Sequence, residues 1–124
     1  MSYDEKEAHD IAASMNMMIY HIYLFKKGPT WTAEPSPEVD ALQEKHLANL
    51  KRLGDSGKLV LNGPLLDSFA VSGEIRGIGV LKTETMAEAK ELLDTDPMVQ
   101  AGRLVYEVHA WMVKKDIPAR CTRP

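Results

Sequence analysis

Two residues of this 124-residue chain, His46 and Asp96, combine a suitable side-chain type with a setting that suits proton transfer. His46 lies in a segment where Val39, Leu42 and Leu50 recur at helical spacing, which predicts that its ring joins the apolar stripe of a helix. A neutral imidazole near pH 7 is suited to act as a general base. The alternative is a core histidine that only hydrogen-bonds a backbone carbonyl, and the residue pattern leaves both interpretations open.

Asp96 precedes Pro97 and therefore also has two interpretations. Its carboxylate is expected to cap a single helical turn that starts at Pro97 and ends before Gly102. A capping carboxylate is held rigidly and stays ionised, which also suits it to orient a histidine. The structural and the functional role are compatible in one residue.

Two further histidines, His21 and His109, fall in segments that are expected to be neighbouring strands. Together with Glu107 they suggest a metal site, but the chain has no HxxxH, HxH or cysteine-paired spacing that would support one. Strand histidines that are partly buried at a subunit interface are the preferred interpretation. We expect no metal, with a zinc or nickel site at these histidines as the alternative.

Three aromatic residues, Tyr20, Trp31 and Trp111, are candidates to line a substrate pocket, with core packing as the alternative for each. Arg76 and Arg103 are candidates to steer an anionic substrate, although arginines at the starts of strands are usually solvated. The chain has no dinucleotide fingerprint, no phosphate-binding P-loop and no GxSxG nucleophile motif.

Charge and cysteine content restrict the partners and the compartment. The formal net charge of −3 argues against a protein held on nucleic acid by general positive charge. The lone Cys121 cannot form an internal disulfide, which favours a reducing cytoplasm. It is also too peripheral to be expected as a nucleophile. No run approaches the roughly 20 apolar residues of a membrane span, and no signal peptide is evident, so we expect no membrane partner.

The order of the expected elements predicts the fold. A helix should begin after Ser36 and end at residues 54–57, and a second should begin after Thr85 and end near Asp94. The expected strands are residues 17–25, 58–63, 75–81 and 104–113. The order βαββαβ is that of an α+β, ferredoxin-like domain with a four-stranded antiparallel sheet. We place it at residues 17–115, after a tail or short helix at 1–16 and before a C-terminal tail at 116–124.

Two helices cover only one face of such a sheet, yet the first strand is apolar on both faces. Met18, Tyr20, Ile22 and Leu24 alternate with the residues of its other face. A second copy of the sheet is the simplest cover for the bare face. The sequence therefore predicts a homodimer whose sheets pack face to face.

Four short motifs resemble those of the YciI-like (YCII-related) family, and they follow one another in its order. They are residues 44–50 (EKHLANL), 61–65 (LNGPL), 94–102 (DTDPMVQAG) and 108–111 (VHAW). The resemblance covers roughly residues 17–115. It implies a dimeric α+β barrel and a His–Asp pair in a pocket between the helices and the sheet.

By motif, the pair of the family falls on His46 and Asp96. The resemblance implies cofactor-free acid–base chemistry, such as elimination, isomerisation or hydrolysis, on a small molecule. We expect His46 to take or deliver a proton, and Asp96 to fix its tautomer and stabilise the imidazolium. The alternative is a non-catalytic small-molecule-binding or stress-response dimer that uses the same pocket.

Overall fold

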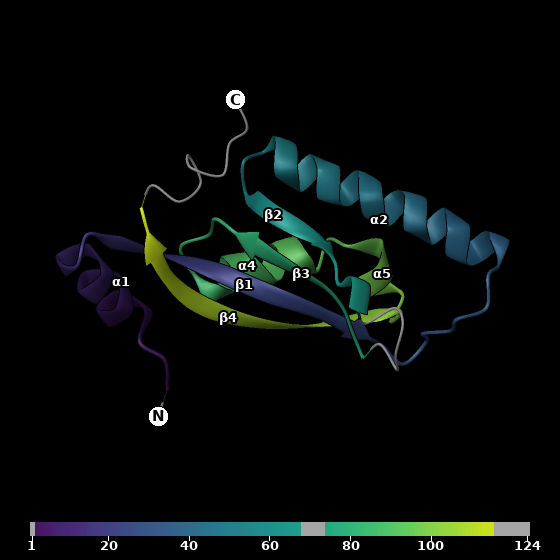
Figure 1. The fold of residues 1–124 in the computed structure, drawn as a ribbon, viewed down its shortest axis with the longest axis horizontal. Coiled ribbons are helices and arrows are strands. Elements are labelled where there is room, and N and C mark those ends of the chain that lie inside the picture. The colour runs from purple at the N-terminus through teal and green to yellow at the C-terminus, as the bar shows by residue number, and fades with distance from the viewer. Residues whose placement is uncertain (1, 68–73, 116–124) are drawn as a thin grey trace.

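The computed structural model describes residues 2–67 and 74–115, and its ribbon is shown in Figure 1. The helices are α1 (Glu5–Ser14), α2 (Pro37–Asp55), α4 (Met86–Leu93) and α5 (Pro97–Gln100). The strands are β1 (Met17–Lys27), β2 (Leu59–Pro64), β3 (Ile75–Leu81) and β4 (Leu104–Lys114). Each predicted strand and helix is present, and β1 extends two residues beyond its predicted end.

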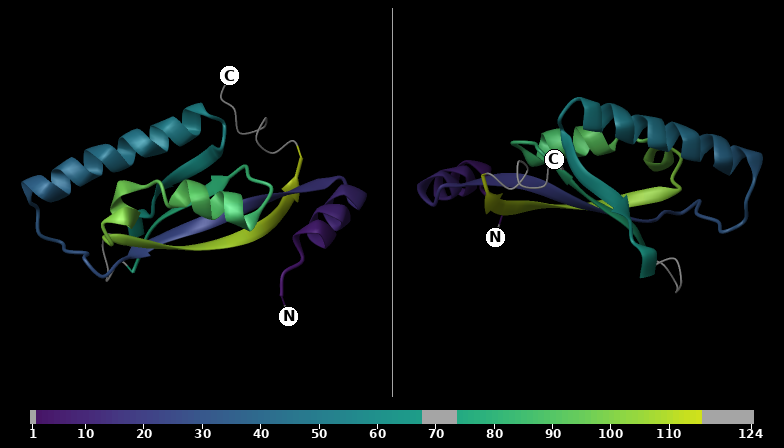
Figure 2. Two further views of the ribbon diagram at one scale, coloured as in Figure 1. Left: turned by 180° about the vertical axis from the view of Figure 1, so that it is seen from behind. Right: turned by 45° about the horizontal axis from the view of Figure 1, so that its top comes forward.

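The four strands form one antiparallel sheet in the order β2-β3-β1-β4. Helices α2, α4 and α5 lie together on one face of this sheet (Figure 2). This arrangement is the predicted α+β, ferredoxin-like fold. It places the longest helix, α2, across the sheet face that also receives the short helix α5.

Side-chain caps fix the starts of α2 and α4, the two longer helices that cover the sheet. The Ser36 hydroxyl accepts a hydrogen bond from the Val39 amide at 3.1 Å, and Thr85 does the same for the Glu88 amide at 3.1 Å. Both helix starts were predicted, because a capping side chain satisfies an amide that the helix itself leaves unpaired. The caps set where along the sheet each helix begins.

The hydrophobic core lies between the helices and one face of the sheet. Its buried members come from every layer, including Tyr23 and Phe25 of β1, Leu53 of α2, Leu93 of α4 and Met98 of α5. Tyr23 and Phe25 are two residues apart, and the side chains of a strand alternate between faces. The odd-numbered residues of β1 therefore face the helices.

The opposite face of the sheet carries the even-numbered residues of β1. Tyr20 pairs with Trp111 and Ile22 pairs with His109 across β1 and β4, so each pair shares this face. Trp111 is 48% exposed there, although a soluble monomer rarely leaves large aromatics on a broad apolar surface. No helix of the described chain covers this face in Figure 2.

The N-terminal segment, predicted as a tail or short helix, forms α1 at the end of the sheet. The Glu5 carboxylate accepts a hydrogen bond from the Met86 amide, and His9 Nε2 donates to the Glu84 carbonyl at 2.6 Å. Ala12 is buried. These contacts attach α1 to the start of α4, outside the main core. The tail predicted at 116–124, including Cys121, lies outside the described residues.

None of the helices described by the structure is long and apolar enough to cross a membrane.

Candidate active site

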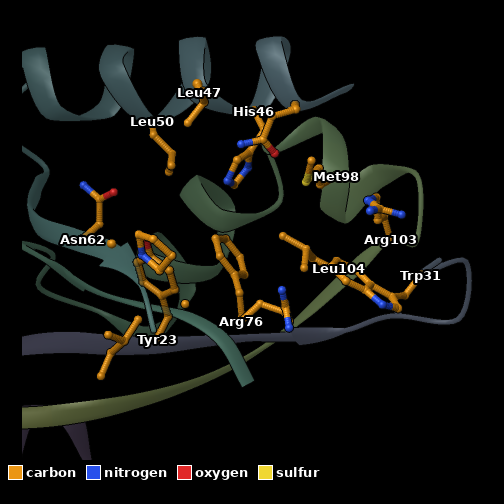
Figure 3. Close-up of a pocket in the computed structure, with 16 residues that line it drawn as sticks. Tyr23, Trp31, His46, Leu47, Leu50, Asn62, Arg76, Met98, Arg103 and Leu104 are labelled. Carbon is orange, nitrogen blue, oxygen red and sulfur yellow. The ribbon is translucent and has the colours of Figure 1, made fainter. Parts of the chain in front are cut away.

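A pocket of about 290 Å³ lies between α2 and the sheet (Figure 3). Helix α2 contributes His46, Leu47 and Leu50 to its wall, and β1 contributes Tyr23 and Phe25. The end of β2 and the start of β3 form another part of the wall. A cavity of about 150 Å³ accepts benzene, so this volume suits a substituted ring or a molecule of similar size.

His46 and Asp96 are in direct contact at the wall of this pocket. His46 Nδ1 lies 2.6 Å from Asp96 Oδ2, and the side chains are only 12% and 2% exposed. The second carboxylate oxygen, Oδ1, accepts the Met98 amide at 2.8 Å. Asp96 therefore caps α5 and holds the histidine with two different oxygens, as the compatible interpretations of the sequence require.

The contact determines which nitrogen of His46 is available for chemistry. An ionised carboxylate only accepts hydrogen bonds, so its partner nitrogen, Nδ1, must carry a proton. In the neutral imidazole the other nitrogen, Nε2, then keeps a free lone pair. Since His46 lines the pocket, this arrangement suits general acid–base chemistry on a molecule bound there.

A polar contact between two segments holds this pair together. Asn49, one turn after His46 on α2, donates from Nδ2 to Thr95 Oγ1 at 3.1 Å. Arg52 donates to the same hydroxyl at 3.3 Å and to the Asn49 side-chain oxygen at 2.8 Å. Thr95 immediately precedes Asp96, so these bonds keep the Asp96 carboxylate beside the histidine face of α2.

Tyr23 is a pocket residue that the sequence interpretation missed. Burial, and secondarily the negative charge of Asp96, raise the pKa of Tyr23, so its hydroxyl stays protonated at neutral pH. Its ring lies over β3, where a Cβ on Gly79 would come within 2.3 Å of the ring. The sequence does carry a signal for this position, because the glycine at 79 has no side chain and so leaves room for a ring to approach the strand.

Of the three predicted pocket aromatics, only Trp31 lines this pocket. Tyr20 and Trp111 do not line this cavity, because both lie on the sheet face opposite the helices. Tyr20 is nevertheless buried, at 3% exposure. Side chains alternate between the two faces of a strand, and Tyr20 and Tyr23 are an odd number of positions apart. Tyr23 therefore lies on the pocket face, where Tyr20 was expected.

Both arginines that were weighed as anion-steering groups line the pocket beside Trp31. The guanidinium carbon of Arg103 lies 4.2 Å from the centre of the Trp31 ring, and that of Arg76 lies 4.7 Å from it. At these distances a cation is attracted to the electron-rich face of the ring. Both arginines are half-buried and packed against Trp31.

The strand histidines cannot share a metal ion. His21 pairs with Ala110 across the two strands, so it lies on the opposite face from His109. His21 is fully buried and contacts Thr83 Oγ1 at 2.9 Å, and burial lowers its pKa. The described residues contain no cluster of three or more histidine, cysteine, aspartate or glutamate side chains suited to a metal.

The model of the YCII-related domain matches residues 15–112 of the chain. Among solved structures, the fold is similar to 5-chloro-2-hydroxyhydroquinone dehydrochlorinase from Burkholderia phenoliruptrix AC1100, in complex with 2,5-dihydroxybenzoquinone. The TM-score is 0.52 and the identity 24%, over 76% of this chain and 93% of that one. No curated protein sequence matches the chain. The family match spans the sheet except for the last two residues of β4 and includes both His46 and Asp96, and the chain belongs to the YCII-related domain family.

Proposed function

We propose that this protein is a cofactor-free acid–base enzyme that acts on a small, ring-sized molecule. The observation that carries the proposal is the short hydrogen bond between His46 and Asp96 in the wall of a pocket. The pair is almost completely shielded from solvent, so its charges are weakly screened and its geometry is fixed.

In the proposed reaction, His46 Nε2 removes a proton from the bound molecule or returns one to it. For an elimination, the carbon–hydrogen bond breaks, its electron pair forms the new double bond, and the leaving group departs with its own electron pair. Asp96 would stabilise the imidazolium that forms while keeping Nδ1 protonated. The buried Tyr23 hydroxyl, whose pKa is raised, supplies a neutral hydrogen-bond donor in the same pocket.

The fold neighbour guides the choice of compounds. That protein carries the name of a dehydrochlorinase, and removal of hydrogen chloride is an elimination that a histidine base can begin. We therefore propose elimination as the first reaction to test, with isomerisation and hydrolysis next.

The first prediction concerns turnover of a defined panel by the wild-type protein. The panel contains 5-chloro-2-hydroxyhydroquinone, its unchlorinated parent, simple aromatic acids and small lactones. Each compound is incubated with the protein in heavy water. Proton NMR would report product formation and the exchange of carbon-bound hydrogen for deuterium. We expect the wild type to transform at least one member, and His46→Gln to be slower by roughly 10²- to 10⁴-fold.

His109→Gln is the matched control, because it removes an exposed histidine from the opposite face of the sheet. It should keep the wild-type rate. A panel member that binds in a thermal-shift assay but is neither transformed nor exchanged by the wild type would favour the alternative, a non-catalytic binding protein.

We also propose that the protein works as a homodimer, in a reducing cytoplasm as the lone cysteine suggests. The sheet face that carries Trp111 is apolar and is not covered by a described helix. A second copy of the same face is a cover of matching shape and polarity.

The second prediction tests that interface. Trp111→Glu places a charge on the bare face and should convert a dimer into a monomer in light scattering after gel filtration. Ile11→Glu on α1 is the matched control, because Ile11 is 45% exposed, almost as much as Trp111. It should leave the mass unchanged. A wild-type protein that is monomeric at all micromolar concentrations would contradict the proposed dimer.

A further inference from the structure

Arg103 has an unusual position in the wall of the pocket. Its Nε and Nη1 atoms are shielded from solvent, and neither has a hydrogen-bond partner among the residues that the structure describes. A buried donor without an acceptor is costly, and more so when it is charged. An acceptor that comes from outside the chain would remove this cost.

The local charge of the pocket is opposite to that of the whole chain. The chain has a formal net charge of −3. Of the described residues that line the pocket, none is acidic, whereas Arg76 and Arg103 are both cationic. Asp96 lies behind His46 and is almost completely buried. A ligand would therefore meet positive charge at the wall of this cavity.

Trp31 adds a flat surface to this positive region. Its ring lies next to both guanidinium groups, and Lys27 Nζ is 5.7 Å from the ring centre. In the view of Figure 3, Trp31 and Arg103 lie toward one end of the pocket and Asn62 toward the other, with His46 between them. A ring-shaped ligand could contact the indole at that end and still reach His46.

Backbone hydrogen bonds hold Trp31 and Arg103 in register. The Gly28 amide donates to the Arg103 carbonyl at 2.8 Å, and the Thr30 amide donates to the Gly102 carbonyl at 3.0 Å. The Trp31 amide donates to the Gly28 carbonyl at 3.1 Å. The cation and the indole are thus positioned before any ligand arrives, which lowers the entropy lost on binding.

We propose that Arg103, with Trp31 beside it, is an anion subsite that selects planar ring compounds carrying a negatively charged oxygen. The oxygen, a carboxylate or an ionised ring hydroxyl, accepts hydrogen bonds from Arg103 Nε and Nη1. The ring then lies within the pocket that contains His46. This assignment rests on the proposed use of the pocket and adds the charge and shape of its substrate.

Binding of benzoate, compared with its neutral analogue benzamide, tests the subsite without any turnover. Two-dimensional NMR of the full chain would follow the Arg103 Nε–H and Trp31 indole signals. We expect benzoate, 4-nitrophenolate or both to shift these signals and benzamide to bind at least tenfold more weakly. Arg103→Gln should weaken binding of the anion by roughly tenfold or more, because charge-assisted hydrogen bonds are lost.

Lys51→Gln is the matched control, because it removes one positive charge from the exposed side of α2, where Lys51 contacts only Asp55 among the described residues and does not line the pocket. It should retain wild-type affinity. The proposal is overturned if benzamide binds as well as the anions, if neither anion binds the wild type, or if the two variants weaken binding equally. If Arg103→Gln does not fold, the benzoate and benzamide comparison on the wild type still decides. Anion binding without turnover of any compound would refute catalysis while leaving the subsite intact.

Discussion

Asp96→Asn is expected to lower kcat by roughly 10²- to 10⁴-fold while leaving the fold intact. The reason lies in how the two oxygens of Asp96 are used. Oδ1 accepts the Met98 amide, and an asparagine keeps this bond only if its own oxygen occupies that position. Its NH₂ group then faces His46 Nδ1, where Asp96 Oδ2 was. Because NH₂ only donates, Nδ1 must become an acceptor and Nε2 must carry the proton. The imidazole then has no free base directed at the ligand.

Nitrogen-15 NMR of the His46 ring checks this tautomer change directly, alongside kcat for the compound that the wild type transforms. Thermal unfolding should hardly change, because asparagine and aspartate are equally good caps. Asp96→Ala, which removes the cap as well, should lose both activity and about 1 kcal/mol of stability. Turnover by Asp96→Asn close to that of the wild type would contradict the proposed role of the pair.

Gly28→Ala is expected to destabilise the protein by about 3 kcal/mol, at the upper end of the range for overpacking. A Cβ on Gly28 would lie 2.2 Å from the Gly102 carbonyl oxygen and 3.0 Å from the Arg103 carbonyl carbon. These are backbone atoms, so no side-chain rotation relieves the clash. The loop that carries Trp31 must move away from the start of β4, and the hydrogen bond from the Gly28 amide is lost.

Denaturant unfolding measures this effect, with Gly63→Ala as the matched control. Gly63 lies in β2 and, like Gly28, has no left-handed backbone, and a Cβ there meets no atom within 4 Å. Its stability should stay within about 0.5 kcal/mol of the wild type. Equal stability of the two variants would show that the loop moves freely, and would remove the basis for a preformed Trp31–Arg103 arrangement.

The fold was predictable because its signals are local. Ser36, Thr85 and Asp96 are capping residues followed by helical patterns, and each is the observed N-cap. The contact of His46 with Asp96 was also predictable in outline, from the apolar stripe around one residue and the rigid turn around the other. The resemblance of the surrounding motifs to those of the YCII-related family led to the same two positions.

The pocket wall was harder to predict, because it depends on which face of the sheet receives the helices. Both faces of β1 are apolar, so Tyr20 and Tyr23 look equivalent along the sequence. Only the packing of α2 against the odd-numbered face distinguishes them. The place of Arg76 and Arg103 in the pocket wall was hard to predict for a similar reason. Strand-start arginines are usually solvated, and nothing local in the sequence indicates that Trp31 lies against both.

The hydrogen bonds that hold the Trp31 loop have a consequence for how related proteins could diverge. The amides of Gly28 and Thr30 and the carbonyls of Gly102 and Arg103 carry them, so they depend on the main chain rather than on side-chain identity. Exposed loop residues such as Thr32 and Glu34 are then free to change without releasing the loop. We therefore expect side-chain exchanges at this edge of the pocket to change ligand preference without disturbing the His46–Asp96 hydrogen bond.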